Sequence, residues 1–239
     1  MTFAILAILF VATFIRSAFG FGEALIAVPL LALIIPIEVA APVAVLVSIT
    51  VSVFAVAQDW RHIHFDSAGR LFVWTIPGIP VGLWLLNTVS EQAVKIMLAA
   101  VIILFSTWLL ADRSPPRLKT SRSAPGFGFV GGILGGAYGM NGPPLVAYGT
   151  LRRWTPQHFR ATLQGYFLPA SLLVLIGYAL TGLWTPAVTR YYLLALPAVV
   201  AAILAGRAIN RHFSPRLFIT CVHAGLILIG MALLWQALV

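Results

Sequence analysis

The sequence predicts an all-α fold, a polytopic bundle of transmembrane helices made of two inverted repeats. Of the 239 residues, 61% are hydrophobic and 9% are charged, whereas soluble domains contain roughly 25% charged residues. The apolar residues fall into runs long enough to cross about 30 Å of hydrocarbon at about 1.5 Å per residue. A water-soluble domain of this length could not bury so much apolar surface.

Residues 3–35 begin the first half as an apolar stretch that Arg16 and the turn Gly20-Phe21-Gly22-Glu23 interrupt. We interpret this stretch as a broken or re-entrant helical hairpin. Three spanning helices are expected after it, near 39–57, 67–86 and 92–111, and they complete an N-terminal repeat of residues 1–112. Pro77 and Pro80 lie inside the second of these helices, and membrane helices tolerate such kinks when neighbours satisfy the freed backbone groups.

A basic linker, residues 113–124, precedes the second half, residues 125–239. The stretch 125–151 is interrupted from Gly135 to Pro144, and the helix after this break, near 143–151, would be only about 13 Å long. It cannot cross a membrane alone, so we interpret 125–151 as a second broken hairpin. Three spanning helices are expected after it, near 158–180, 188–206 and 217–238.

Short sequence matches support the repeat. They join Ala18-Phe19-Gly20 to Ala137-Tyr138-Gly139, Ile76-Pro77 to Leu196-Pro197, and Val89-Ser90 to Phe213-Ser214. Each half therefore has the same predicted order, a glycine-broken hairpin followed by three spanning helices. Each half crosses the membrane an odd number of times, whether its hairpin crosses twice or not at all. The second half therefore begins on the side opposite to the first half and is inverted relative to it.

The positive-inside rule places the linker 113–122 in the cytoplasm and both termini outside. The loops at 87–91 and 181–187 then face outward, and neither contains a lysine or arginine. Lys95 and Arg190 lie near outer helix ends, where such side chains can snorkel. The expected location is the inner membrane of a cell, with multiple crossings.

The two breaks predict a site for an anion near the midplane. Irregular backbone survives inside a membrane only where protein or a water-filled cavity covers it, and paired breaks in inverted halves point to a transporter's substrate site. The helices expected to begin near Ala24 and Pro143 direct their N-termini at the breaks and present free N–H donors, which suit an oxyanion. The expected binding residues are Gly20, Phe21, Gly22, Gly139, Met140, Asn141, Gly142 and Pro143. The other interpretation is that the glycines only permit close helix packing.

Two motifs make the chain resemble the TauE/SafE family of sulfite exporters and sulfonate permeases. One is Gly-Phe-Gly early in the first half. The other is Gly-Gly-x-x-Gly-x-x-Gly-Pro-Pro-Leu-Val, followed by Leu151-Arg152 and Phe159-Arg160-Ala161-Thr162-Leu163. The resemblance implies a secondary transporter of sulfite, sulfonates or sulfoacetate-like anions, whose path the two breaks line. Glu23 is a departure, because the family's first half is usually richer in glycine there.

Charged and polar residues near the breaks are candidates for coupling or gating. Arg16 pairs with Glu23, contacts the substrate, or snorkels outward. Glu23 carries a proton that couples uptake, or it is an acid that stabilises a helix N-terminus. Arg160 and Gln164 lie four apart, on one helix face, and form an inner gate or first anion contact; alternatively, Arg160 is a positive-inside anchor.

Charge distribution and residue spacing also indicate which other partners and sites to expect. All six acidic residues precede position 113, and eleven of the fifteen cations follow without any acid, which favours anions as partners. The cations are scattered, so nucleic-acid binding is not expected. His62, His64 and Asp66 lack a second ligand pair for zinc, and no metal or cofactor is expected.

No nucleophile–base constellation indicates an enzyme. A channel-like facilitator, an intramembrane enzyme and an assembly protein remain the alternatives to a transporter. The expected partners are a small anion, membrane lipid and, if uptake is coupled, protons; a homo-oligomer is compatible with the sequence.

Overall fold

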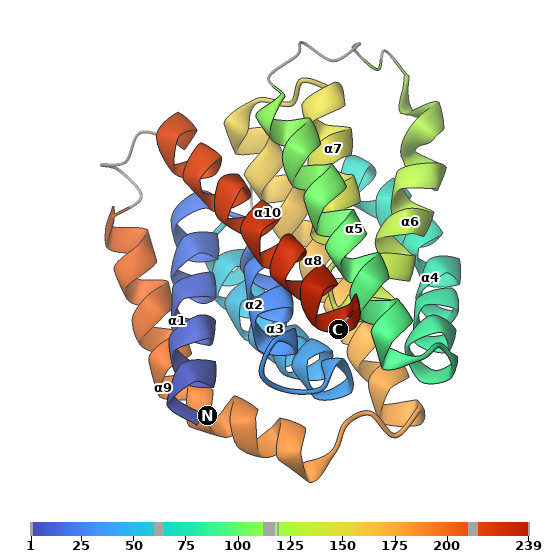
Figure 1. Cartoon of the computed structure of the whole chain (residues 1–239). Coiled ribbons are helices and arrows are strands. Elements are labelled where there is room, and N and C mark those ends of the chain that lie inside the picture. Colours follow the sequence, from blue (N-terminus) through green and yellow to red (C-terminus); the bar gives the residue numbers. More distant parts are fainter. Residues whose placement is uncertain (1, 60–64, 112–117, 119, 210–214, 239) are drawn as a thin grey trace.

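A computed structural model describes residues 2–59, 65–111, 118, 120–209 and 215–238, and these form ten α-helices, one short 3-10 helix and no strand (Figure 1). The helices of the first half are α1 (Thr2–Phe19), α2 (Glu23–Ala32), α3 (Ile37–Asp59), α4 (Phe65–Thr88) and α5 (Glu91–Leu110). Those of the second half are η2 (Ser121–Ser123), α6 (Ala124–Tyr138), α7 (Gly142–Leu151), α8 (Pro156–Leu180), α9 (Pro186–Ile209) and α10 (Pro215–Leu238). The prediction of a helical membrane bundle is confirmed.

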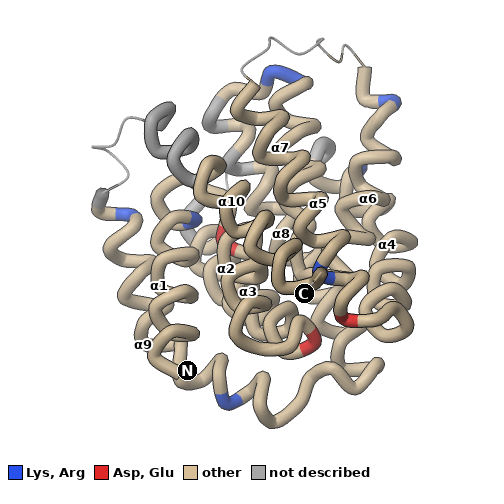
Figure 2. The backbone as a smooth tube through the Cα atoms, in the orientation of Figure 1, with Lys and Arg blue, Asp and Glu red and all other residues tan. Residues whose placement is uncertain are grey.

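Among the described residues, six helices are long and apolar enough to cross a membrane, namely α1, α3, α4, α5, α8 and α9. Helix α10 covers the remaining predicted span, and its part from His223 to Leu238 is apolar. Helix α1 is the first arm of the predicted hairpin 3–35, whose crossing the sequence left open, and its 18 residues are long and apolar enough to span a membrane. Figure 2 shows long uncharged stretches through the bundle, with few charged positions.

The two halves interlock rather than pack as separate units. The first helix of each half packs on the fourth helix of the other half, because α1 lies against α9 and α6 against α4. Helix α3 packs on α8, and α5 packs on α10, so helices that hold the same position in the order of each half also meet. Consequently the two halves share one hydrophobic core, and neither half has a core of its own.

The contact between α4 and α6 is backbone against backbone. A Cβ atom added to Gly132 of α6 would lie 2.3 Å from the Thr75 carbonyl oxygen, and one added to Gly78 of α4 would lie 2.2 Å from the Phe129 carbonyl oxygen. Small residues let membrane helices approach this closely, where van der Waals contact replaces the missing hydrophobic driving force. Helices α4 and α6 therefore form a tight pair.

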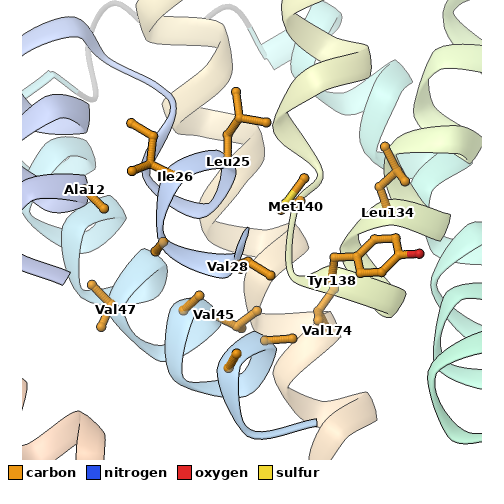
Figure 3. Packing of buried hydrophobic residues seen from close by; sticks show 14 of the residues in the cluster. Ala12, Leu25, Ile26, Val28, Val45, Val47, Leu134, Tyr138, Met140 and Val174 are labelled. Carbon is orange, nitrogen blue, oxygen red and sulfur yellow. The ribbon is translucent and has the colours of Figure 1, made fainter. Parts of the chain in front are cut away.

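The short helix α2 and the second break are buried together in the middle of the bundle. Figure 3 shows Leu25 and Val28 of α2 beside Met140, with Val45 of α3 beneath them. All four side chains are buried. This packing covers the non-helical backbone of the second break, whose residues 139–141 are buried, as a structure inside a membrane requires.

Candidate functional site

The first break is a two-glycine turn between α1 and α2. Gly20 and Gly22 have φ angles of 90° and 100°, values that L side chains rarely adopt. The Gly20 N–H donates to the Arg16 carbonyl oxygen at 2.6 Å, which ends α1, and Glu23 then begins α2. The chain therefore reverses direction here within the three residues 20–22.

The second break follows the same principle. Gly139 has a φ angle of 65°, and its N–H donates to the Gly135 carbonyl oxygen at 2.7 Å. Helix α7 begins at Gly142. The two predicted helix starts, near Ala24 and Pro143, are each within one residue of the observed ones.

A cavity lies between the two breaks. Its volume is about 30 Å³, the room that about two water molecules need. Residues of the first break on its wall are Arg16, Phe21, Gly22, Glu23, Ala24 and Leu25. Those from the second break are Met140, Asn141, Gly142, Pro143 and Val146, and other helices contribute Ser48, Phe105 and Phe167.

Arg16 is the centre of a buried polar network at this cavity. Its Nη1 donates to Glu23 Oε2 and to Ser48 Oγ, each at 2.6 Å. Its Nη2 donates to Ser52 Oγ at 2.6 Å and to Gln164 Oε1 at 3.3 Å. Because Ser48 and Ser52 lie on α3 and Gln164 on α8, the guanidinium joins elements of both halves.

The Arg16–Glu23 pair is almost completely removed from solvent. Arg16 is 3% exposed and Glu23 is 1% exposed, and the Phe167 ring covers the guanidinium at 5.0 Å from its centroid. Of the three expectations for Arg16, snorkelling is therefore wrong and pairing with Glu23 is confirmed. The reason is that α3 and α8 supply enough acceptors to hold the cation inside the bundle.

The pair is not fully satisfied. Within the described part of the chain, Arg16 Nε and Glu23 Oε1 have no hydrogen-bond partner, although both atoms are buried. An unpaired buried polar atom costs about 1–3 kcal/mol, and more where it is charged. One free donor and one free acceptor thus remain beside a cavity.

The two helix N-termini at the cavity offer different numbers of donors. In α2, Ile26 donates the first helical bond to the Gly22 carbonyl oxygen at 3.1 Å, so the N–H groups of Glu23, Ala24 and Leu25 precede it. Helix α7 begins Gly-Pro-Pro, and proline has no N–H. Most backbone donors for an anion therefore come from α2, whereas two equivalent N-termini were expected from the sequence.

Gln164 connects α8 to the first break. Besides accepting from Arg16, it donates from Nε2 to the Gly20 carbonyl oxygen at 3.0 Å. Gly20 itself and Gly139 shape the turns and are not among the residues on the cavity wall. Asn141 lies on that wall and is 5% exposed, and its side chain does not cap α7.

Phe21 and Arg160 lie toward the N-terminal end of α8. The Phe21 ring meets the Phe159 ring edge to face, with 6.0 Å between centroids, so it closes one side of the cavity. Arg160 is the residue after Phe159 in α8, and its side chain lies outside the described part of the structure. Its role as a gate stays a prediction.

Seven residues of the site were not predicted from the sequence: Ser48 and Ser52, which bond Arg16, and the wall residues Ala24, Leu25, Phe105, Val146 and Phe167. The two serines are four apart and share one face of an otherwise apolar helix, which was a usable signal. Phe167 follows Gln164 by three positions, so it lies on the same side of α8. Nothing local distinguishes it from the other aromatic residues of the chain.

Among the described residues there is no group of three or more His, Cys, Asp or Glu side chains that could hold a metal. His62, His64 and the Asp66 side chain, which the sequence analysis weighed as a zinc site, lie outside the described residues. His223 of α10 meets Ser106 Oγ of α5 through Nδ1 at 3.2 Å, a contact between two buried side chains.

Comparison with known proteins gives one family. The family described as sulfite exporter TauE/SafE matches residues 5–233. The chain is also 27% identical over 238 residues to a protein named probable sulfite/organosulfonate exporter TauE from Cupriavidus necator, covering 97% of this chain and 93% of that protein. No solved structure gives a significant match.

Proposed function

The chain belongs to the sulfite exporter TauE/SafE family, and we infer that the substrate it carries is sulfite or a small organosulfonate such as sulfoacetate. As a member of that family it is a multi-pass membrane transporter and not an enzyme. The relative from Cupriavidus necator, which matches along nearly its whole length, carries sulfite and organosulfonate in its name, and this supports the substrate class.

We propose that the anion binds in the cavity between the two breaks. The observation that carries the proposal is Arg16, a 3% exposed cation on the cavity wall beside the free N–H groups of the first turn of α2. Guanidinium and helix N-termini are the groups that bind oxyanions in proteins. Six of the eight predicted binding residues lie on the same wall, namely Phe21, Gly22, Met140, Asn141, Gly142 and Pro143, whereas Gly20 and Gly139 do not.

Transport is proposed to be secondary. No Walker loop is present in the sequence, and a univalent anion that leaves a negative-inside cell is driven by about 2.3 kcal/mol per 100 mV. Uptake of the same anion needs a co-transported cation. Glu23 is then the proposed proton carrier, with Gln164 and Arg160 as the proposed gate.

The proposed location is the inner membrane of the cell, with the linker 113–122 inside and both termini outside. In Figure 1 the end of α5 and the start of α6 lie at the upper edge of the bundle, and the N-terminal end of α1 lies at the lower edge. This arrangement supports opposite sides for the linker and the N-terminus.

Flux into proteoliposomes tests the transporter. Purified protein is reconstituted, and sulfite and sulfoacetate uptake are measured under imposed voltage and pH gradients. We expect saturable flux, whereas flux that stays proportional to concentration would identify a channel-like facilitator. No flux of either anion in protein shown to be inserted would contradict the proposed substrates.

Gly142→Leu tests the position of the site. A Cβ at Gly142 would lie 3.7 Å from Phe167 Cζ, an ordinary contact, so the variant can fold while the rest of the side chain fills the cavity. We expect transport to fall to background. Gly139→Leu is a poorer test, because the positive φ and a 2.7 Å contact with Val45 Cγ2 would strain the fold itself.

The matched control is Gly225→Leu, at a glycine of α10 with nothing within 4 Å of an added Cβ. This variant is expected to insert and to transport as the wild type does. Normal flux through an inserted Gly142→Leu protein would place the anion path elsewhere.

A further inference from the structure

We propose that the Glu23 carboxylate is a tethered competitor of the transported anion, holding on Arg16 the place that the anion takes when it binds. Binding of one anion is then linked to uptake of one proton from solution by Glu23. The proposal rests on the anion site proposed above. It adds that protonation of Glu23 frees Arg16 for the anion.

The geometry places both groups where an anion would lie. Glu23 Oε2 accepts from Arg16 Nη1 at 2.6 Å, and both residues are on the cavity wall. The other Arg16 contacts are to the neutral side chains of Ser48, Ser52 and Gln164. Among the described residues, Glu23 is therefore the one negatively charged partner of Arg16. An incoming anion would make the same charged contact.

Charge balance makes the two occupants exclusive. The empty site holds one cation and one carboxylate, so its net charge is zero. An anion added to an ionised pair would put two negative charges on one buried cation, where screening by water is weak. If Glu23 takes up a proton as the anion binds, the net charge of the site stays zero.

The carboxylate has a place for that proton. Glu23 Oε1 has no hydrogen-bond partner within the described part of the chain, so a proton there breaks no existing bond. The neutral carboxyl group releases Nη1, and the unpartnered Nε of Arg16 is a second donor near the cavity. A purely structural ion pair would be expected to have both groups satisfied.

Other titratable groups near α2 do not replace Glu23 in this role. Helices α1, α3, α5, α7 and α10 pack on α2. Besides Arg16, their described titratable side chains are Glu38 at the start of α3, the pair Glu91–Lys95 at the start of α5, Tyr148 in α7 and His223 in α10. His223 is bonded to Ser106 and lies behind the Phe105 ring, at 5.8 Å between centroids, while none of the others is on the cavity wall.

Equilibrium binding to purified protein in detergent tests the proposal without any flux. Methanesulfonate is the probe, because its charge stays constant across the pH range used. Calorimetric titrations in two buffers with different ionisation heats count the protons taken up. We expect about one proton per bound anion at pH 7–8, and an affinity that falls about tenfold for each added pH unit.

Glu23→Gln removes the competitor's charge and is expected to bind methanesulfonate at least about tenfold more tightly at pH 8, with no proton uptake and no pH dependence. Glu91→Gln is the matched control, since Glu91 also begins a helix and pairs with a cation, Lys95, at 2.9 Å. That variant should keep the wild-type proton count and affinity.

The outcomes separate this inference from the proposed function. Wild-type protein that binds methanesulfonate without taking up a proton would overturn the competitor and leave the anion site standing. Weaker binding by a folded Glu23→Gln protein would do the same. Wild-type protein that binds neither methanesulfonate nor sulfite would overturn both, and the proton count on the wild type needs no variant to fold.

Discussion

A cation buried as deeply as Arg16 is stable inside a membrane because its surroundings replace the water contacts of its two terminal nitrogens. Four hydrogen bonds, to Glu23, Ser48, Ser52 and Gln164, account for the two terminal nitrogens, and the Phe167 ring covers the guanidinium plane. Lysine could not do this, since its ammonium is a compact point charge without the planar fork. The network thus depends on arginine.

Arg16→Met is expected to destabilise the protein by about 3–5 kcal/mol, because it leaves Glu23 buried as an unpaired charge. Adding Glu23→Gln removes that charge, so the double variant should recover most of the lost thermal stability. Transport should be lost in both proteins, because the proposed anion donor is gone from both.

Thermal unfolding in detergent, followed by intrinsic fluorescence, measures the first effect, and flux in proteoliposomes measures the second. A double variant no more stable than Arg16→Met would mean that the arginine is held for its packing rather than for its charge. Flux through the double variant would remove Arg16 from the anion site.

At the scale of elements, the α4–α6 pair contrasts with the cavity that lies between α2 and α7. Thr75 Oγ1 of α4 bonds the Gly128 carbonyl oxygen of α6 at 3.0 Å and the Tyr166 hydroxyl of α8 at 2.6 Å. Backbone contact and these buried bonds leave the pair little room to move. Any rearrangement that opens the cavity is therefore easier in the short helices than between α4 and α6.

Gly132→Ala is expected to lower the stability of the protein by about 1–3 kcal/mol, because its Cβ would overlap the Thr75 carbonyl oxygen and force the helices apart. The control is Gly126→Ala in the same helix, which has nothing within 4 Å of an added Cβ. It should be neutral or slightly stabilising, since alanine favours helix more than glycine does. Equal melting temperatures for the two variants would contradict the tight contact.

The elements themselves were largely predictable because their signals are local. Glycines with positive φ end α1 and α6, and Pro143 in the first turn suits the start of α7, so the predicted breaks agree closely with the observed ones. Whether α1 crosses the membrane was left open by the sequence, because Arg16 lies within its apolar run. A buried partner seven residues away makes it compatible with the membrane.

At the scale of the whole molecule, the exchange of helices between halves is the feature that a duplicated and inverted unit would produce. Helix α1 packs on α9 as α6 packs on α4, and the equivalent helices α3 and α8 meet. We propose on this basis that the halves are related by inversion, which places the linker and the 181–187 loop on opposite sides of the membrane.

Single cysteines in a Cys221→Ala chain test this topology. Thr181→Cys, at an exposed position after α8, should react with a membrane-impermeant maleimide on intact cells. Thr120→Cys, at an exposed position before η2, should react only after the cells are permeabilised. Labelling of both positions on intact cells would contradict the inverted arrangement.

The site was predictable only in part, for a reason that also belongs to the whole molecule. Glycines and the charges Arg16 and Glu23 stand out within one segment, but Ser48, Ser52 and Phe167 join them through packing of α3 against α1 and of α8 against α3. Which faces of distant helices meet is decided by the entire bundle. No window of local sequence contains that information.

The short separation between Arg16 and Glu23 has a consequence for how the protein is made. The two residues lie seven positions apart, on consecutive helices, whereas Gln164 follows Arg16 by 148 positions. As the nascent chain leaves the ribosome, the arginine therefore meets its counter-charge before any later helix exists. Each charge alone would cost about 2.5–3.5 kcal/mol at the membrane centre, so early pairing lets the first hairpin enter the bilayer as a neutral unit.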